Sequence, residues 1–384
     1  MPCILLPISK SIANRLLILQ AIHGDDLMVV PSDMPDDVQL LHRALTTLKT
    51  LRTSETLSTP RINVANCGTA MRFLTAYCAQ LEGQTTILDG VERMHHRPIG
   101  QLVDALRSIG ADIEYLGEED FPPLRITGKA LNKKLPITLN HPQSTQFVSA
   151  LLLIGANVQT DSTSPYIILT REIIKKYQYP SRSQKVDCER NVVENKVVDV
   201  VDLDLLERDW SAAAFWYEYV ALHGGEITLP GLYRDSLQGD KVVADIFTRL
   251  GVQTTYTAEG IIIVSTGVAD LQRSDLQGTD ARSTAQQSAE EILCQDFSAC
   301  PDLYPTVALT CERLGIELHA TGTDSLPLKE SDRLRAVREH RTDHDHRMAM
   351  ALLIAGYEVE DTACISKSYP QFIEQWNNVI RSHA

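Results

Sequence analysis

The fold class of this chain is decided by the stretch PIGQLVDALRSIG (residues 98–110) and by the segment IEY (113–115) that follows it. Proline stands in the first turn of an expected helix, and Leu102 and Leu106 repeat at the spacing of one buried helical face. Gly110 suits the left-handed position that closes a helix, and the short run after it has the composition of a strand. The stretch therefore predicts a helix, a closing glycine and a strand in succession.

The same unit recurs along the whole chain. The expected helix-closing glycines are Gly24, Gly83, Gly110, Gly224, Gly251, Gly315 and Gly356. Short strands are expected after all but the last of them, at residues 27–30, 85–88, 113–115, 227–229, 254–256 and 316–319. This pattern predicts an α/β (α+β) fold in which helices pack on strands, and its variable spacing excludes a solenoid.

Two stretches interrupt the pattern. Residues 172–198 carry dense charge and are expected to form a pair of strands with polar turns, and residues 265–295 are expected to form a long surface excursion. With 384 residues, of which 43% are hydrophobic, the chain is long enough for two domains that each bury a core. We expect the boundary between them near Glu207.

Composition excludes several classes of protein. There is no apolar run of membrane-spanning length and no secretory leader pattern, so a cytoplasmic location is expected. The eight cysteines lack metal-ligand spacing, so we expect reduced thiols and no metal site. A formal net charge of −14 argues against a nucleic-acid partner, but not against small anions bound where Lys and Arg cluster.

Several short motifs place such residues at expected helix starts. Lys10, Ser11 and Arg15 begin one helix, where free backbone N–H groups attract anions, although a capped helix with a solvated base has the same pattern. Gly68 begins another and would let a ligand oxygen approach the backbone, or it simply forms a turn. Arg93 is expected in a loop before the helix of residues 98–110, where arginine is usually solvated.

Further motifs combine hydroxyl, acidic and basic side chains. Ser144 and Thr145 open a helix and suit phosphate oxygens, but an ordinary N-cap is the alternative. Asp302 begins an apolar helix, where a carboxylate is usually a cap. Lys329 and Arg333 stand one helical turn apart, which usually indicates a solvated face. The motifs DHRMAM (345–350) and SKSYP (366–370) complete the set, and only the joint occurrence of all of them favours a binding site.

In this order the motifs resemble the 3-phosphoshikimate 1-carboxyvinyltransferase family, also called EPSP synthase. They are SKSxxNR, NxGTAMR, ERMxxRPI, STQF, SLQGD, PD, KESDRL, DHRMAM and SKSYP, between Leu6 and about Phe372. The resemblance implies two similar domains of three β-α-β-α-β-β units each (an inside-out α/β barrel), at residues 9–207 and at 1–8 plus 208–384. It also implies transfer of the enolpyruvyl group of phosphoenolpyruvate to the 5-hydroxyl of shikimate 3-phosphate, with release of phosphate, in the shikimate pathway of aromatic amino acid biosynthesis.

The resemblance also implies the site residues. Shikimate 3-phosphate would be bound by Lys10, Ser11, Arg15, Ser144, Thr145, Gln146, Thr163, Tyr166, Ser325 and Lys329. Phosphoenolpyruvate would be bound by Lys10, Gly68, Arg93, Gln146, Arg333, Arg347 and Lys367. Asp302 would be the base, and Glu330 with Lys10 the proton donor. Two phosphorylated carboxylates need such a set of cations to offset their repulsion and desolvation, and the chemistry needs no cofactor and no metal.

The chain departs from the family pattern at several places. Ile8, Cys67, Phe73 and Thr145 replace usual residues near the site, but none of them deletes a charge. Between Arg335 and Asp345 the family normally has a further helix and strands. We therefore predict an incomplete last repeat in which Arg333 and Arg347 still face one ligand. The family implies a monomer, and self-association would occur at the shortened repeat.

Two alternatives remain at this stage. One is a descendant that binds ligand or a partner without turnover, which the shortened repeat suggests. The other is the sister enzyme that transfers enolpyruvyl to UDP-N-acetylglucosamine, which uses a cysteine on a mobile loop and lacks the KESDR and DHRMAM motifs.

Overall fold

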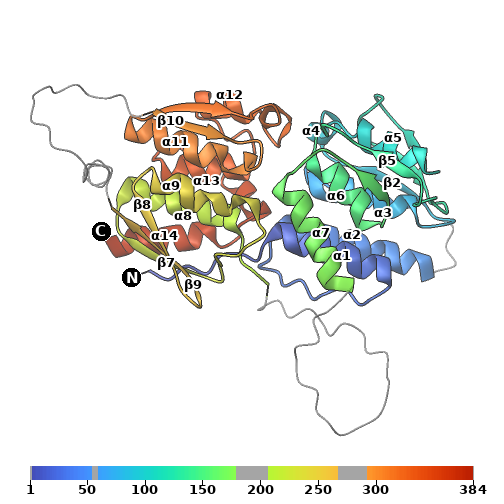
Figure 1. Cartoon of the computed structure of the whole chain (residues 1–384), viewed down its shortest axis with the longest axis horizontal. Coiled ribbons are helices and arrows are strands. Elements are labelled where there is room, and N and C mark those ends of the chain that lie inside the picture. The colour runs from blue at the N-terminus through green and yellow to red at the C-terminus, as the bar shows by residue number, and fades with distance from the viewer. Residues whose placement is uncertain (1, 54–58, 179–205, 267–291, 384) are drawn as a thin grey trace, which may run out of the picture. The chain divides into compact units, whose positions relative to one another are not determined.

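The computed structural model describes residues 2–53, 59–178, 206–266 and 292–383 (Figure 1). The chain separates into two compact units. The N-unit comprises residues 11–32 and 37–206, and the C-unit comprises residues 1–10, 33–36 and 207–384. Both units combine helices with short strands, so the expected α/β (α+β) class is confirmed. No helix in the described residues is both long and apolar enough to cross a membrane.

A four-stranded sheet of order β1-β2-β4-β3 organises the first part of the N-unit. Its elements are β1 (Arg61–Asn63), α3 (Gly68–Ala79), β2 (Thr85–Asp89), α4 (Glu92–His95), α5 (Gly100–Ser108), β3 (Asp112–Tyr115) and β4 (Leu124–Thr127). β1 and β2 are parallel, and β4 is antiparallel to both β2 and β3. With the short α4 set aside, the run has the order β-α-β-α-β-β.

The rest of the N-unit is mostly helical. Its elements are α1 (Lys10–His23), α2 (Asp36–Thr53), β5 (Pro136–Thr138), α6 (Thr145–Leu153), β6 (Asn157–Gln159) and α7 (Pro165–Gln178). α6 packs against both α3 and α7, and β5 pairs in parallel with β6. α7 covers residues 172–178, so the expected strand is wrong there, and the remainder of 172–198 lies outside the described residues.

The C-unit begins with a three-stranded antiparallel sheet of order β7-β9-β8. Its elements are α8 (Trp210–His223), β7 (Glu226–Pro230), η2 (Gly239–Val242), α9 (Val243–Thr248), β8 (Val252–Tyr256) and β9 (Gly260–Ser265). The N-terminal segment joins this sheet, since Cys3 forms a parallel bridge with Thr228. The expected excursion at 265–295 lies mostly outside the described residues, which resume with β10.

The last part of the C-unit carries two parallel strands, β10 and β11. Its elements are β10 (Ile292–Asp296), η3 (Pro301–Leu303), α11 (Tyr304–Leu314), β11 (Glu317–Thr321), η4 (Leu326–Leu328), α12 (Arg333–Glu339), α13 (His346–Ile354), η5 (Ala363–Lys367) and α14 (Phe372–His383). After β11 the described chain forms helices only. α12 and α13 are joined by residues 340–345, as the short spacing in the sequence predicted.

Aromatic side chains fill the core of the C-unit. Trp216 and Phe215 on α8 lie against Phe372 on α14, with ring centroids 6.0 Å apart in each pair. Trp216 Nε1 also donates to Tyr369 Oη at 3.0 Å. Burying rings of this size stabilises a fold by about 1.5–3 kcal/mol each. The core thereby fixes α8 and the segment that follows Lys367.

All of the glycines expected at helix ends have a positive φ, and Gly315 closes α11 in the left-handed conformation at φ 72°. The expectation is wrong at Gly83 and Gly251, because α3 already ends at Ala79 and α9 at Thr248, and neither glycine directly follows the C-cap of its helix. Strands follow at every expected place except residues 27–30, which form no strand. Leu27–Val30 has suitable composition, but no neighbouring strand of the described chain pairs with it.

Candidate active site

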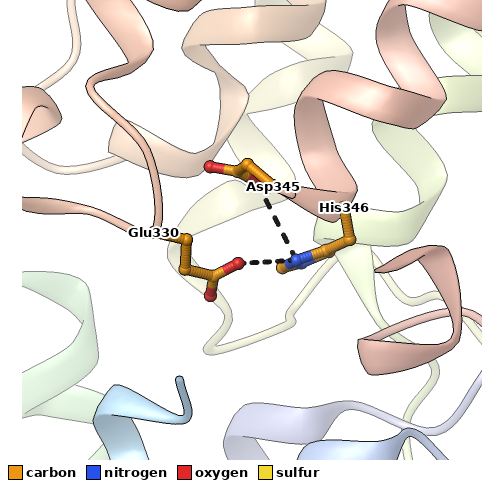
Figure 2. A group of neighbouring side chains, drawn as sticks. All are labelled: Glu330, Asp345 and His346. Atoms are coloured by element: carbon orange, nitrogen blue, oxygen red, sulfur yellow. Dashed lines mark ion pairs between the residues drawn. The ribbon is translucent and has the colours of Figure 1, made fainter. Parts of the chain in front are cut away.

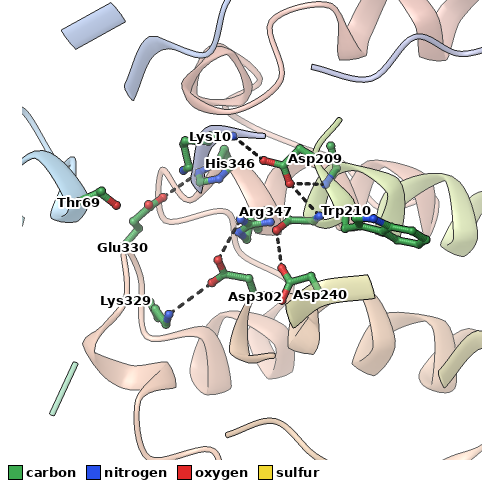
Figure 3. A network of polar contacts seen from close by, with 12 residues as sticks. Lys10, Thr69, Asp209, Trp210, Asp240, Asp302, Lys329, Glu330, His346 and Arg347 are labelled. Carbon is green, nitrogen blue, oxygen red and sulfur yellow. Dashed lines mark hydrogen bonds and ion pairs between the residues drawn. The ribbon is translucent and has the colours of Figure 1, made fainter. Parts of the chain in front are cut away.

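Three cations of the C-unit converge on the carboxylate of Asp302, and Figure 3 shows two of them, Lys329 and Arg347. Arg333 Nη1 lies 2.7 Å and Lys329 Nζ 3.4 Å from Oδ1, and Arg347 Nη2 lies 2.9 Å from Oδ2. Burial alone would raise the pKa of Asp302, but Arg347, Lys329 and Arg333 together hold it well below the usual range. Asp302 is therefore ionised in this state.

The four residues come from different elements. Asp302 lies in η3, just before α11, whose N-cap is Leu303. Among the described residues Asp302 accepts no capping hydrogen bond, so the capping alternative is wrong. Arg333 starts α12 and is 1% exposed, so the solvated face expected for KESDR is also wrong. Lys329 precedes α12 rather than sharing its helix. The shortened connection nevertheless lets Arg333 and Arg347 meet on one carboxylate.

The carboxylate of Asp345 bonds to both Arg333 and Arg347 and fixes their relative positions. Its Oδ1 accepts from the backbone N–H of Arg347 at 2.9 Å and caps α13, while its Oδ2 accepts from Arg333 Nε at 2.8 Å. Ser331 Oγ donates to the same Oδ2 at 3.1 Å. Burial raises the pKa of Asp345, but Arg333 turns the balance and the pKa is lowered. One buried carboxylate thus fixes both the start of α13 and one edge of the Arg333 guanidinium.

A second ionic group surrounds Glu330. Its Oε1 lies 2.8 Å from Lys367 Nζ, and its Oε2 lies 2.8 Å from His346 Nδ1. Burial would raise the pKa of Glu330, but Lys367, His346 and the nearby Lys10 hold it well below the usual range. Burial lowers the pKa of His346 despite Glu330. Glu330 is therefore a carboxylate in this state, and donating a proton would require it first to gain one.

Glu330, Asp345 and His346 lie close enough to hold a metal ion (Figure 2). The charges around them argue against this. Both oxygens of Asp345 already accept hydrogen bonds, and Lys367 and Arg333 would repel a cation. We interpret the group as part of the ionic network.

Lys10 joins the network from the N-terminal segment. Its backbone N–H donates to Asp209 Oδ2 at 3.1 Å, and Asp209 also caps α8 through its other oxygen (Figure 3). Asp240 lies beside Asp302 and accepts from Ser211 Oγ. Burial and the charge of Asp302 raise the pKa of Asp240 to about 6.

Within the described residues of the N-unit, a buried arginine donates its hydrogen bonds to neutral oxygens. Arg15 Nε donates to Thr170 Oγ1 at 2.7 Å, and its Nη1 donates to the Ser11 carbonyl at 2.7 Å. Its Nη2 donates to Ser149 Oγ and to the Tyr166 carbonyl, both at 3.3 Å. Burial lowers the pKa of Arg15 to about 10. A buried cation without a carboxylate among these bonds is suited to an anionic ligand.

Two more arginines close around Gly68. A Cβ atom at Gly68 would lie 2.4 Å from Arg97 Nη2 and 2.8 Å from Arg72 Nη1, so a side chain there would displace the ends of both guanidinium groups. Burial and the neighbouring Arg97 lower the pKa of Arg72. The backbone amide at the start of α3 and these guanidinium groups form a positive region in which an anion would be stabilised.

The other predicted residues lie as follows. Ser144 caps α6 by accepting from the Gln146 N–H at 3.3 Å, and Gln146 Nε2 donates to Thr69 Oγ1 at 3.0 Å. Thr145 begins α6. Arg93 lies in α4 and not in the expected loop. Thr163 is exposed just before α7, and Ser325 immediately precedes η4.

Sequence reasoning missed several residues of this network. Asp209, Asp240, Asp345 and His346 contact or face predicted residues, and Arg72 and Arg97 flank Gly68. All except Asp209 stand inside the sequence motifs described above, next to the residues that were predicted to bind substrate. Asp209 had the signal of a helix cap, Asp-Trp-Ser before an apolar run, which does not distinguish a site residue from an ordinary cap.

Comparison with known proteins supplies the family. The sequence model of the family EPSP synthase (3-phosphoshikimate 1-carboxyvinyltransferase) matches residues 3–340 and 338–376 of this chain. The two matched segments meet at the end of α12, just before the turn that leads to α13. A 3-phosphoshikimate 1-carboxyvinyltransferase of Bacteroides fragilis (strain YCH46) is 36% identical over 421 residues, covering 97% of this chain and 93% of that protein. This alignment is longer than the chain, so the relative has residues that this chain lacks.

More distant proteins agree. A 3-phosphoshikimate 1-carboxyvinyltransferase of Colwellia psychrerythraea is 28% identical, covering 97% of this chain and 95% of that protein. An EPSP synthase structure from Acinetobacter baumannii has a TM-score of 0.62 at 18% identity, covering 98% of this chain and 95% of that one, and shows the shared fold. The family model spans nearly all of the chain. This protein therefore belongs to the EPSP synthase (3-phosphoshikimate 1-carboxyvinyltransferase) family.

Proposed function

We propose that this chain transfers the enolpyruvyl group of phosphoenolpyruvate to the 5-hydroxyl of shikimate 3-phosphate and releases phosphate. The observation that carries the proposal is the convergence of Lys329, Arg333 and Arg347 on Asp302, a base candidate set among donors for an anionic substrate. The same contacts argue against a descendant that binds ligand without turnover. That alternative rested on the shortened repeat, and the short turn does not separate Arg333 from Arg347. No observation favours transfer to a UDP-sugar.

The proposed chemistry is an addition followed by an elimination. Glu330, next to Lys10 and Lys367, first takes up a proton from solvent. Asp302 then accepts the proton of the 5-hydroxyl, whose oxygen forms a bond to C2 of phosphoenolpyruvate, while Glu330 gives its proton to the C3 methylene. In the elimination C3 returns a proton to Glu330, the bond from C2 to the phosphate oxygen breaks, and the departing phosphate takes the proton from Asp302, which leaves the enolpyruvyl ether. Cations near C2 and the phosphate stabilise the negative charge that the substrates bring into the site.

The two units divide the binding. We assign shikimate 3-phosphate mainly to the N-unit, through Ser11, Arg15, Ser144, Thr145, Gln146, Thr163 and Tyr166, with Lys10, Ser325 and Lys329 of the C-unit. We assign phosphoenolpyruvate to Lys10, Arg333, Arg347 and Lys367, with Gly68, Arg93 and Gln146. The neutral surroundings of Arg15 and the positive region at Gly68 support these assignments. We further propose that the units correspond to the domains at 9–207 and at 1–8 plus 208–384. Each would be an inside-out α/β barrel, and the last repeat of the second domain would be shortened.

The test is phosphate release with both substrates. We expect release only when phosphoenolpyruvate and shikimate 3-phosphate are present together, and the enolpyruvyl ether should appear in equal amount. Lys10→Met should reduce kcat by about 10²–10³-fold or more, because it removes a charge beside Glu330. Lys129→Met is the control, since Lys129 forms a surface ion pair with Asp112. Wild-type turnover in the Lys10 variant would remove Lys10 from the machinery, and no release by the wild type would refute the proposed function.

A further inference from the structure

The two units satisfy their buried cations in different ways. In the N-unit, the hydrogen bonds of Arg15 go to neutral oxygens. In the C-unit, Arg333 and Arg347 already contact a carboxylate of the chain itself, Asp302. The donors that would bind phosphoenolpyruvate in the C-unit are therefore occupied by an internal anion.

The geometry shows which of these partners can leave. The side chains of Arg333 and Arg347 are 2% and 5% exposed, whereas that of Asp302 is 21% exposed. Arg333 keeps a second carboxylate, because its Nε is bonded to Asp345, which is fully buried and caps α13. Losing Asp302 would thus free Arg333 Nη1 and Arg347 Nη2 without releasing Arg333 from its place.

We propose that Asp302 occupies the anion-binding donors of Arg333 and Arg347 until a substrate anion replaces it, and that this exchange frees Asp302 to act as the base. The inference deepens the proposed function and rests on it for the identity of the anion as phosphoenolpyruvate. In the unliganded state the Asp302 carboxylate is engaged on both oxygens by guanidinium groups and is a poor proton acceptor. After exchange, the same carboxylate lies among fewer compensating charges.

The groups around Asp302 give the direction of the proton change. Arg333 of α12, Arg347 of α13 and Lys329 before α12 lower its pKa, whereas burial and the facing Asp240 of η2 act the other way. Cys300 faces it as a thiol whose pKa is raised by burial, and Asp345, Asp209 and Glu330 act on the arginines rather than on Asp302 directly. An anion that takes over the guanidinium groups should therefore raise the proton affinity of Asp302, and protons should be taken up on binding.

The probe is sulfate, an anion that does not titrate near neutral pH. Its binding to the full chain is measured by titration calorimetry at pH 6, in two buffers of different ionisation enthalpy and at constant ionic strength. The difference in heat gives the protons taken up. We expect uptake by the wild type, and we expect Asp302→Asn to bind sulfate about tenfold more tightly, the effect of about one lost charged hydrogen bond, with less proton uptake.

Asp240→Asn is the matched control. It removes a neighbouring buried carboxylate while leaving the three cations on Asp302, so proton uptake should persist. Equal or weaker sulfate binding by Asp302→Asn, binding by the wild type without proton uptake, or loss of uptake in Asp240→Asn would each overturn the proposal. If circular dichroism shows that Asp302→Asn does not fold, the wild type and Asp240→Asn decide the question by the same proton measurement.

The outcome is separable from the proposed function. Sulfate binding does not depend on turnover, so the exchange can hold in a chain that releases no phosphate. Conversely, a chain that turns over normally but takes up no proton with sulfate would keep the proposed function and lose this inference.

Discussion

At the scale of the residue, the site is a problem of charge compensation. Asp345 is a buried carboxylate, and Asp302 and Glu330 are partly buried ones; adjacent cations hold all three ionised, and breaking such a pair would leave a charge without compensation. Glu218 on α8 is the contrast. It is fully buried, and neither carboxylate oxygen has a hydrogen-bond partner among the described residues.

Glu218 provides a test of stability against pH. Burial raises its pKa well above the ordinary value of 4.5, so the folded chain holds the proton more tightly than the unfolded chain. The stability contributed by the protonated form is fully present below the unfolded pKa and is lost as pH rises through the folded pKa. Glu218→Gln, which cannot ionise, should therefore raise the free energy of unfolding at pH 8 by about 1–3 kcal/mol, and by less at pH 5.

Urea denaturation at the two pH values measures this difference. Glu374→Gln, at an exposed position on α14, should change stability little at either pH. A Glu218 variant that is less stable than the wild type at pH 8 would show that the carboxylate has a partner in the folded protein.

At the scale of the element, the turn between α12 and α13 is short and has an unusual backbone conformation. His340, Asp343 and His344 all adopt positive φ, at 51°, 44° and 58°. Asp343 Oδ2 accepts from Arg335 Nη2 at 3.1 Å, and its Oδ1 accepts from Arg341 Nε at 3.0 Å. A constrained turn of this kind keeps the starts of the two helices, and hence Arg333 and Arg347, close together.

Substitutions of Asp343 separate conformation from charge. Asp343→Ala should lower the free energy of unfolding by about 1–2 kcal/mol, because alanine tolerates the left-handed region poorly, and it should raise KM for phosphoenolpyruvate. Asp343→Asn keeps the tolerance and loses only the exposed ion pairs, so its loss should be smaller. Denaturation and initial-rate kinetics measure both effects, and equal losses in the two variants would mean that backbone conformation is not the reason.

The edge of the last sheet is a second test at this scale. Within the described residues β10 pairs only with β11, and Ile292 at its start is 51% exposed. We expect weak self-association through this edge, seen as a sedimentation coefficient that rises with concentration, and Ile292→Lys should remove it. Val29→Lys, at a more exposed apolar position outside any strand, should leave it unchanged. A wild type that sediments as a monomer at all concentrations would contradict the prediction.

At the scale of the whole molecule, each unit carries buried arginines to which the proposed function assigns phosphorylated ligands. Arg15 belongs to the N-unit and Arg333 and Arg347 to the C-unit, so a ligand that satisfies both sets should draw the units together. X-ray scattering should show a smaller radius of gyration with shikimate 3-phosphate and inorganic phosphate than without ligand. Shikimate, which lacks the phosphate, should have less effect, and equal radii in all three samples would argue for a chain that does not close.

The sequence alone determined the features that depend on neighbouring residues. Glycines at helix ends, the starts of α3, α5 and α6, and the turn after Glu339 follow from local backbone preferences and short-range periodicity. The same local information failed at residues 27–30, because a strand exists only where another strand pairs with it. It also failed at residues 172–178, where helical packing against α6 prevailed.

Only the tertiary structure decided which charges compensate one another. Asp302 looked like a helix cap and Arg333 like a solvated side chain, because short-range patterns cannot distinguish a cap or an exposed face from an ion pair formed between distant segments. Folding brings η3, α12 and α13 together, and burial then makes the partner of each ion decisive for its charge. For the same reason the sequence predicted which cations belong to the candidate site, but it could not predict that Asp302 forms ion pairs with them.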